Sequence, residues 1–297
     1  MKIVQSYWSK PVLERGQRRG EDRKRGGWID IKFHYMSWAL SCLSFQKFYP
    51  EIQLVTDTFG KSILIDRIGL PYTLFRTDLD HLMDNNTDLW AIAKLHTYSL
   101  QTEPFLHVDN DVFIWKRLKE IENEQLVVQN NEVNIPFYKE IWNQIREHFS
   151  YLPTYMTEDF KIRPEIYACN AGIFGGQDIT FIKEFVHEAF EFLSRNKECF
   201  SNIKMLGWSV LIYEQYLFSC LARRRQKKVS PLLPYTDNRY IETADFSGVA
   251  YKKYYVHTAA STKRDEGTCH DLAARLRLEY PEYYYRIEGL ARNHALE

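Results

Sequence analysis

An Asp-x-Asp triplet at the end of an apolar segment constrains this chain more than any other feature of its sequence. The largely apolar residues 105–108 precede Asp109 and Asp111, and an apolar run resumes at 112–114. Two carboxylates at the end of a buried strand repel each other and lose hydration unless a cation joins them. At this spacing their oxygens can reach one Mg²⁺ or Mn²⁺ and leave coordination positions for a diphosphate. The alternative interpretation is a strand followed by an Asx-type turn. The rest of the sequence has to distinguish a metal site from such a turn.

Composition excludes several classes of function. Lysine plus arginine equals aspartate plus glutamate at 39 each, so the electrostatic signature of a nucleic-acid-binding protein is missing. No apolar stretch approaches the roughly 20 residues that span a membrane, and residues 2–5 are typical of a strand rather than of a signal peptide. The five cysteines are scattered without a C-x-x-C pair, which predicts reduced thiols. We therefore expect a cytoplasmic protein without a transmembrane segment.

The order of predicted elements indicates the fold class. Strands are predicted at residues 3–7, 52–55, 72–75, 105–108, 166–169 and 254–257, and helices at 30–47, 61–68, 88–101, from 178 onward and at 209–224. Alternation of strands and helices predicts an α/β protein with a mostly parallel mixed sheet flanked by helices. In such sheets ligands bind beyond the carboxyl ends of strands, where Asp109 and Asp111 fall. No repeat or low-complexity linker interrupts the chain, so a single domain is the simplest account.

Four segments in chain order carry the functional interpretation. They are Trp90-Ala91-Ile92-Ala93-Lys94-Leu95, Leu106-His107-Val108-Asp109-Asn110-Asp111-Val112, Cys169-Asn170-Ala171-Gly172-Ile173-Phe174-Gly175 and Tyr255-Val256-His257-Thr258-Ala259-Ala260-Ser261-Thr262-Lys263. Their order resembles that of GT-A-fold glycosyltransferases, most closely the glycogenin and lipopolysaccharide galactosyltransferase type. The resemblance implies a Rossmann-type GT-A-like domain over residues 1–297. Its donor-binding part would cover about 1–115 and its acceptor side about 116–297.

The resemblance also implies roles for individual residues. Asp109, Asp111 and His257 would bind the metal, and a histidine ligand favours Mn²⁺ over Mg²⁺. Lys94 and Lys263 would offset the charge of the donor's diphosphate. The other donor-binding candidates are Tyr7, Trp8, Asp57, Asn110, Ala171 and Gly172. Tyr7, Trp8 and Asp57 are inferred only from their positions after the first and second strands.

Catalysis in retaining members of this family involves polar side chains beneath the transferred sugar. Glu214 and Gln215 stand where the family has such residues, and the Asn170 amide can hydrogen-bond sugar hydroxyls. Tyr216 departs from the family pattern beside them, and Arg264 replaces a proline after Lys263. The implied activity is hexosyl transfer, with retention, from a UDP-sugar to an unidentified saccharide, lipid-linked or protein acceptor. Surface polysaccharide synthesis is one setting for such an activity.

Other interpretations remain open at this stage. An inverting enzyme needs one well-placed base, which Glu214, Asp159 or Asp245 could supply. Asp-x-Asp also serves nucleotidyl and phosphoryl transfer, although no P-loop sequence occurs. A catalytically degenerate GT-A-fold binding protein would explain the departures from the family pattern. Intact Asp109, Asp111 and His257 argue against that last possibility.

Two basic segments have uncertain roles. The charged loop at residues 14–27 is either a solvated loop or a flap that helps to hold an anionic ligand. The cluster at 223–228 is most simply a helix end whose charges favour the helix dipole. It could instead form a peripheral contact with a membrane surface or an anionic acceptor.

Overall fold

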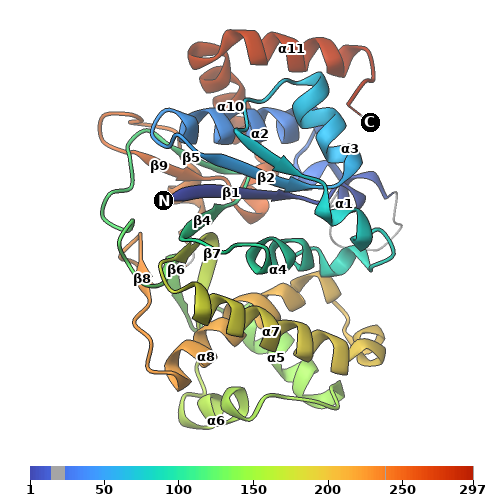
Figure 1. Cartoon of the computed structure of the whole chain (residues 1–297), viewed down its shortest axis with the longest axis vertical. Coiled ribbons are helices and arrows are strands. Elements are labelled where there is room, and N and C mark those ends of the chain that lie inside the picture. The colour runs from blue at the N-terminus through green and yellow to red at the C-terminus, as the bar shows by residue number, and fades with distance from the viewer. Residues whose placement is uncertain (15–23, 238, 297) are drawn as a thin grey trace. The chain divides into compact units, whose positions relative to one another are not determined.

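The computed structural model in Figure 1 describes residues 1–14, 24–237 and 239–296. The chain divides into two compact units, each built from segments that are separated in the sequence. Unit 1 comprises residues 1–84, 108–118 and 239–297, and unit 2 comprises residues 85–107 and 119–238. Most of the charged loop predicted at 14–27, namely residues 15–23, lies outside the described residues.

Unit 1 contains three parallel, paired strands in the order β3-β2-β1. β1 (Lys2–Tyr7) and β2 (Ile52–Thr56) pair with Ile3 opposite Ile52, and β3 (Leu74–Arg76) forms the outer strand. All residues of β2 are buried, as expected of a parallel strand covered on both faces. The carboxyl ends of β1 and β2 carry the predicted donor-site residues that follow these strands.

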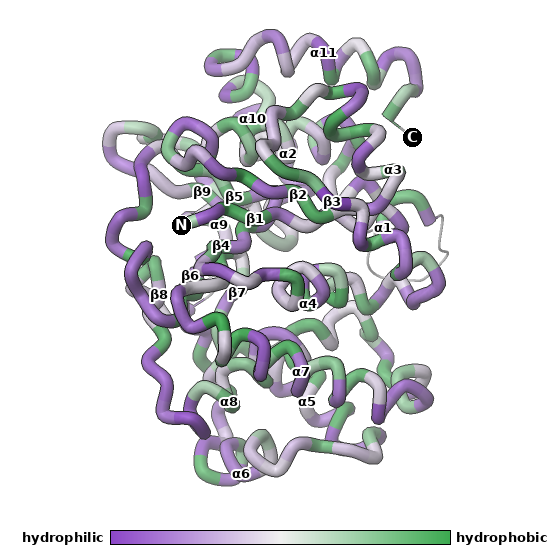
Figure 2. Tube along the Cα trace, in the orientation of Figure 1, coloured by the Kyte–Doolittle hydropathy of each residue, from purple (hydrophilic) through white to green (hydrophobic). Residues whose placement is uncertain are grey.

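Helix α2 (Ile31–Gln46) is the central helix of unit 1. Asp30 begins it by accepting a hydrogen bond from the Lys32 backbone N–H at 2.9 Å. Residues 33–45 of α2 are all buried, so this helix is covered on every side. α10 (Glu266–Glu279) and α11 (Pro281–Arg292) contribute to the same core. Figure 2 shows hydrophilic and hydrophobic stretches alternating along α11, as in an amphipathic surface helix.

The remaining helices of unit 1 are short. They are α1 (Lys10–Leu13), α3 (Thr58–Lys61), α9 (Tyr240–Ala244), the π-helical segment Ser62–Arg67 and the 3₁₀ segments Lys24–Gly27, Asp78–Leu82 and Ala260–Arg264. A second, two-stranded sheet pairs β5 (Val112–Ile114) with β9 (Tyr255–His257) in antiparallel register. This pairing brings the segment after the Asp-x-Asp triplet to a strand near the end of the chain.

Unit 2 has a mixed sheet around β6 (Val127–Val133). β7 (Tyr167–Gly176) runs antiparallel to β6, and the short β8 (Ser230–Pro231) runs parallel to it. β4 (Phe105–Val108), most of which belongs to this unit, follows β7 in the strand order. A register shift between Val128 and Asn130 bends β6 next to its polar residues.

The helices of unit 2 cover the aromatic part of its core. They are α4 (Ile92–Ser99), α5 (Pro136–His148), α6 (Thr154–Ile162), α7 (Ile179–Arg195), α8 (Leu217–Arg224), the π-helical segment Leu211–Tyr216 and the 3₁₀ segments Thr87–Leu89, Lys197–Asn202 and Leu206–Ser209. Asp178 begins α7 by accepting from the Phe181 N–H at 3.0 Å, as its sequence predicts. The Phe218 ring lies 4.9 Å from that of Phe174 and 5.2 Å from that of Phe185.

The predicted fold class is confirmed by the strand pairing. β1–β2, β2–β3 and β6–β8 are parallel and β6–β7 is antiparallel, in an α/β arrangement with flanking helices. That the chain is a single domain divided functionally near residue 115 stays a prediction. The five cysteines are free thiols, as expected. Among the residues that the structure describes, no helix combines the length and apolar character that crossing a membrane requires.

Replacing Gly176 by alanine is expected to destabilise the fold by about 3 kcal/mol. Gly176 has φ 128°, and a Cβ there would lie 2.2 Å from the backbone oxygen of Gln125. A backbone atom cannot swing aside as a flexible side chain can. Gly289 in α11 is the matched control, because a Cβ there meets nothing within 4 Å. Its replacement by alanine should stabilise by roughly 0.5–1 kcal/mol, and urea unfolding of both variants would check the contrast.

Candidate functional site

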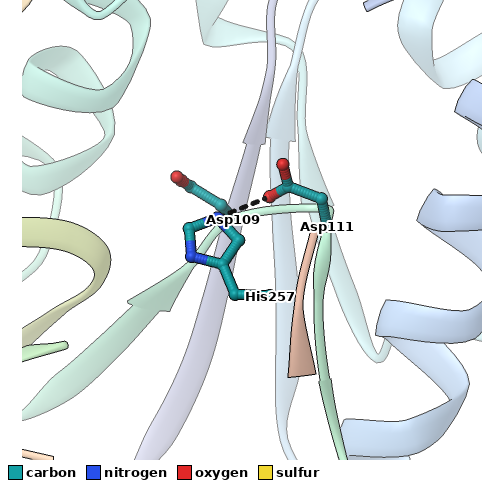
Figure 3. A group of neighbouring side chains, drawn as sticks. All are labelled: Asp109, Asp111 and His257. Atoms are coloured by element: carbon teal, nitrogen blue, oxygen red, sulfur yellow. Dashed lines mark ion pairs between the residues drawn. The ribbon is translucent and has the colours of Figure 1, made fainter. Parts of the chain in front are cut away.

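Asp109, Asp111 and His257 form one group in unit 1. Each offers a ligand atom, and these atoms all lie within 4.8 Å of one another. Figure 3 shows the two carboxylates rising from the turn after β4, with the His257 ring reaching them from β9. The β5–β9 register explains the approach, because His257 lies opposite Val112, the residue after Asp111. Two carboxylates and an imidazole are a suitable donor set for a divalent cation.

Lys263 completes this group. Its Nζ lies 2.6 Å from Oδ2 of Asp111, while Nε2 of His257 lies 3.3 Å from Oδ1. Burial by itself raises the pKa of the Asp111 carboxyl, but the charges of Lys263 and His257 outweigh burial and hold that pKa below its ordinary value. Asp111 is therefore ionised despite being buried. Apart from Nε2 of His257, its Oδ1 has no hydrogen-bonding neighbour among the described residues.

Polar groups lie next to Lys263 and Asp111, and of these only Asn110 was a candidate from the sequence. The Lys263 Nζ donates to the Gly26 carbonyl at 3.4 Å and lies 5.9 Å from the centre of the Trp28 ring. Burial, followed by the charge of Lys263, lowers the pKa of His34 to about 3, so its ring is neutral. The Trp28 indole N–H and the Asn110 amide NH₂ are buried without a hydrogen-bond partner among described residues. No motif in the sequence marked Trp28 or His34 as neighbours of the Asp-x-Asp segment.

The three donor-site residues inferred from position lie within the packed part of unit 1. The Tyr7 ring lies 5.0 Å from that of Trp38 and 5.7 Å from that of His34, and its hydroxyl is 3.2 Å from that of Tyr35. Trp8 is also buried. These contacts hold Tyr7 in the hydrophobic core. Stacking of Tyr7 or Trp8 on a nucleobase stays a prediction.

Asp57, the third of these residues, stabilises the loop after β2. Its two carboxylate oxygens accept the backbone N–H groups of Ser9, at 2.6 Å, and Gly60, at 2.7 Å. The carboxylate thus caps α3 and ties the end of β1 to the end of β2. A contact between Asp57 and a base or ribose stays a prediction.

Lys94 and Glu214 form a buried ion pair in unit 2. Nζ of Lys94 lies 3.1 Å from Oε1 of Glu214 and donates to the Ala171 carbonyl at 3.2 Å. The Tyr98 hydroxyl donates to the same Glu214 oxygen at 3.1 Å. Both charged side chains are almost fully buried, with 6% and 1% of their surfaces exposed. Lys94 thereby links the predicted Asn-Ala-Gly segment to the predicted Glu-Gln pair.

Asn170 and Gln215 meet a second polar group of unit 2. Asn170 donates from Nδ2 to Oε1 of Glu132 at 3.0 Å and accepts from the Gly172 N–H at 2.9 Å. The Tyr138 hydroxyl lies 2.5 Å from Oε2 of Glu132 and also contacts Oε1 of Gln215. Sequence reasoning missed Glu132 and Tyr138. No motif in the sequence marked Glu132, whose burial follows from the pairing of β6 with β7.

His107 and two candidate bases for inversion, Asp159 and Asp245, have partners within the fold. Burial, followed by the charge of Lys94, lowers the pKa of His107 well below its ordinary value, which keeps this ring neutral. Asp159, one candidate base for inversion, accepts two hydrogen bonds from the Arg223 guanidinium, at 2.8 and 2.7 Å. Asp245 in unit 1, another candidate, accepts from the Ser247 N–H at 2.8 Å. These contacts occupy the two carboxylates within the fold.

The basic cluster at 223–228 pairs with acids of its own unit. The ion pairs are Arg223–Asp159, Arg224–Glu158, Arg225–Glu184, Lys227–Asp178 and Lys228–Glu124. Each basic side chain of the cluster therefore has a neighbouring carboxylate. Contact of this cluster with a membrane or an anionic acceptor stays a prediction.

The sequence matches the profile of DUF6734, a family of unknown function, over residues 1–290. The chain belongs to this family. A comparison of this DUF6734 protein with curated proteins finds no match.

Among solved structures, the DUF6734 chain is similar to the galactosyltransferase LgtC in complex with donor and acceptor sugar analogs. The match has 10% identity and a TM-score of 0.36, and covers 71% of this chain and 70% of LgtC. The bifunctional glycosyltransferase WbbM matches at 12% identity with a TM-score of 0.46. That match covers 96% of this chain and 51% of WbbM, so the chain spans about half of WbbM's length.

Proposed function

We propose that this protein is a metal-dependent glycosyltransferase that uses a nucleotide-diphosphate sugar, with UDP as the nucleotide. The observation that carries the proposal is the grouping of Asp109, Asp111, His257 and Lys263. It combines a donor set suited to a divalent cation with an ammonium group 2.6 Å from one of the carboxylates. A divalent cation with an ammonium group nearby suits a diphosphate leaving group, because the released nucleoside diphosphate carries more negative charge than a single divalent ion offsets.

The residues of unit 1 fit the group that this function requires. Asp109, Asp111 and His257 would hold the ion, and the only hydrogen-bonding neighbour of the buried Oδ1 of Asp111 in the described chain is His257, itself one of these three ligands. When bound, a divalent cation supplies charge stabilisation for the leaving diphosphate. Lys263 would contact a phosphate oxygen, and the Asn110 amide NH₂, buried and unpartnered in the described chain, would donate to the same ligand. The presence of His257 favours Mn²⁺.

The polar residues of unit 2 support a sugar-handling role. Lys94 fixes Glu214, and Glu132 fixes Asn170, so the amide and carboxylate groups of unit 2 are held in defined orientations. We propose Glu214, Gln215 and Asn170 as catalytic residues, Lys94, Ala171 and Gly172 as donor-binding residues, and retention at the anomeric carbon.

Isothermal titration of the protein with UDP, with Mn²⁺ and with EDTA, tests this proposal. We expect saturable 1:1 binding of UDP with Mn²⁺ and at least about tenfold weaker binding with EDTA, a difference of about 1.4 kcal/mol. GDP and CDP in the same format serve as nucleotide controls. If none of the three nucleotides binds in the presence of Mn²⁺, the donor-site assignment is wrong and a degenerate binding protein becomes the better account. Binding of all three with equal affinity would remove the assignment of UDP alone.

A further inference from the structure

A row of buried serines on α2 faces the Asp-x-Asp turn. Ser37, Ser41 and Ser44 are spaced i, i+4 and i+7, which places them on one side of the helix. Exposed fractions of 0%, 0% and 2% show that none of them reaches solvent. A serine hydroxyl inside a helix ordinarily returns to its own helix backbone or points to water. All three bond to another segment of unit 1, and two of them bond to the Asp-x-Asp turn itself.

The hydroxyls of the first two serines hold the backbone of the turn itself. Ser37 Oγ donates to the Asn110 carbonyl at 2.7 Å, and Ser41 Oγ donates to the Asp109 carbonyl at 3.4 Å. The same turn is closed by the Val112 N–H, which donates to the Asp109 carbonyl at 3.1 Å. The peptide groups on both sides of Asn110 therefore have fixed partners on α2, and these groups set the directions in which the two carboxylates leave the chain.

The orientation of the Ser41 hydroxyl is itself determined by a chain of hydrogen bonds. The Gln5 amide in β1 donates to Ser41 Oγ at 2.9 Å, which leaves the hydroxyl hydrogen for Asp109. The Tyr72 hydroxyl donates to the Gln5 Oε1 at 2.7 Å, which fixes which end of the amide faces Ser41. The chain of hydrogen bonds from Tyr72 through Gln5 and Ser41 thus ends on one carbonyl of the turn. Such connected networks hold a single arrangement more firmly than isolated bonds.

We propose that Ser37 and Ser41 are positioning residues for the metal group, acting through the backbone of the Asp109–Asp111 turn. This inference rests on the proposed metal site. Losing either hydroxyl removes one of the hydrogen bonds that hold the peptide groups of the turn, and lets the carboxylates shift from the arrangement that gathers them near His257. Outer groups that orient metal ligands typically change metal affinity by 10–100-fold when they are removed.

The test is a titration of the protein with Mn²⁺, followed by electron paramagnetic resonance, alone and in the presence of UDP. Ser37→Ala and Ser41→Ala should each weaken Mn²⁺ binding by roughly 10-fold. Ser44→Ala is the matched control. Ser44 is a buried serine of the same helix, but it accepts from the Ile114 N–H at 3.2 Å rather than bonding the turn. It should lose similar folding stability in urea and keep wild-type Mn²⁺ affinity.

The outcomes distinguish failure of the metal site from failure of the positioning role. If the wild-type protein binds no Mn²⁺ in either condition, the metal site is wrong and the positioning role is overturned with it. If the wild type binds Mn²⁺ and the three alanine variants differ only in folding stability, the metal site stands and the positioning role is overturned. Gln5→Leu provides a further variant that leaves both serines in place. It should weaken Mn²⁺ binding in the same direction as Ser41→Ala.

Discussion

Replacing Asp111 by asparagine should reduce Mn²⁺-dependent binding of UDP by more than about 100-fold, beyond the range typical of groups that only support a ligand. The substitution keeps the size of the side chain but removes the charge that holds Lys263 at 2.6 Å. It also replaces one carboxylate oxygen, a preferred ligand of hard cations, by an amide nitrogen that cannot bind them. Titration with UDP at fixed Mn²⁺ measures the effect, and urea unfolding without metal measures any accompanying loss of stability.

Asp66→Asn provides the control for this variant. Asp66 also pairs with a lysine of unit 1, Lys61, at 2.8 Å, but its side chain is 51% exposed and has no place in the metal group. UDP affinity should therefore be unchanged in Asp66→Asn. Wild-type UDP affinity in a folded Asp111→Asn protein would contradict the donor site, whatever the behaviour of the control.

Replacing Lys94 by methionine should destabilise the protein by about 3 kcal/mol, the lower end of what breaking a buried ion pair costs. The change leaves the Glu214 carboxylate, 1% exposed, without its cation and the Ala171 carbonyl without that donor. Exposure rather than distance decides the size of the effect. Lys227 is closer to its partner Asp178, at 2.6 Å, but 40% of its side chain is exposed.

Lys227→Met is therefore the matched control in unit 2, with an expected change within about 1 kcal/mol. Urea unfolding at one temperature would compare the two variants. The double variant Lys94→Met/Glu214→Leu should recover part of the loss, because it removes the buried charge that the single variant leaves behind. If Lys94→Met and Lys227→Met destabilise the protein equally, the Lys94–Glu214 pair is not shielded from solvent as the structure indicates.

The sequence predicted the elements whose periodicity and end signals are local. The helix predicted at 30–47 is observed at Ile31–Gln46, and Asp178 begins α7 as predicted. β7 was predicted to end near residue 169, yet it continues to Gly176. Pairing with β6 keeps the residues after 169 in the sheet. Local composition could not show that partner, because strand pairing is decided by tertiary contacts.

In the candidate site, too, residues marked by local motifs were predicted, whereas contacts that depend on packing were not. Asp109, Asp111 and His257 come together in the structure as their motifs predict, since each stands at a strand end. The contacts of Ser37 and Ser41 could not be predicted from the sequence, because a serine within an apolar helix does not indicate which carbonyl its hydroxyl will bond. Which oxygen a buried hydroxyl contacts depends on how helices pack, and a single sequence does not specify that packing.

The pairing of β5 with β9 gives the metal group a place in the order of synthesis. Asp109 and Asp111 leave the ribosome before residues 119–238 are made, whereas His257 and Lys263 come almost half a chain later. During that interval the strand that pairs with β5 does not yet exist, and the ammonium that compensates Asp111 is still to come. A polypeptide that stops short of β9 would carry the whole Asp-x-Asp motif and still lack the metal group. The grouping of two carboxylates, an imidazole and an ammonium group therefore forms only in a chain whose β9 and Lys263 have been made.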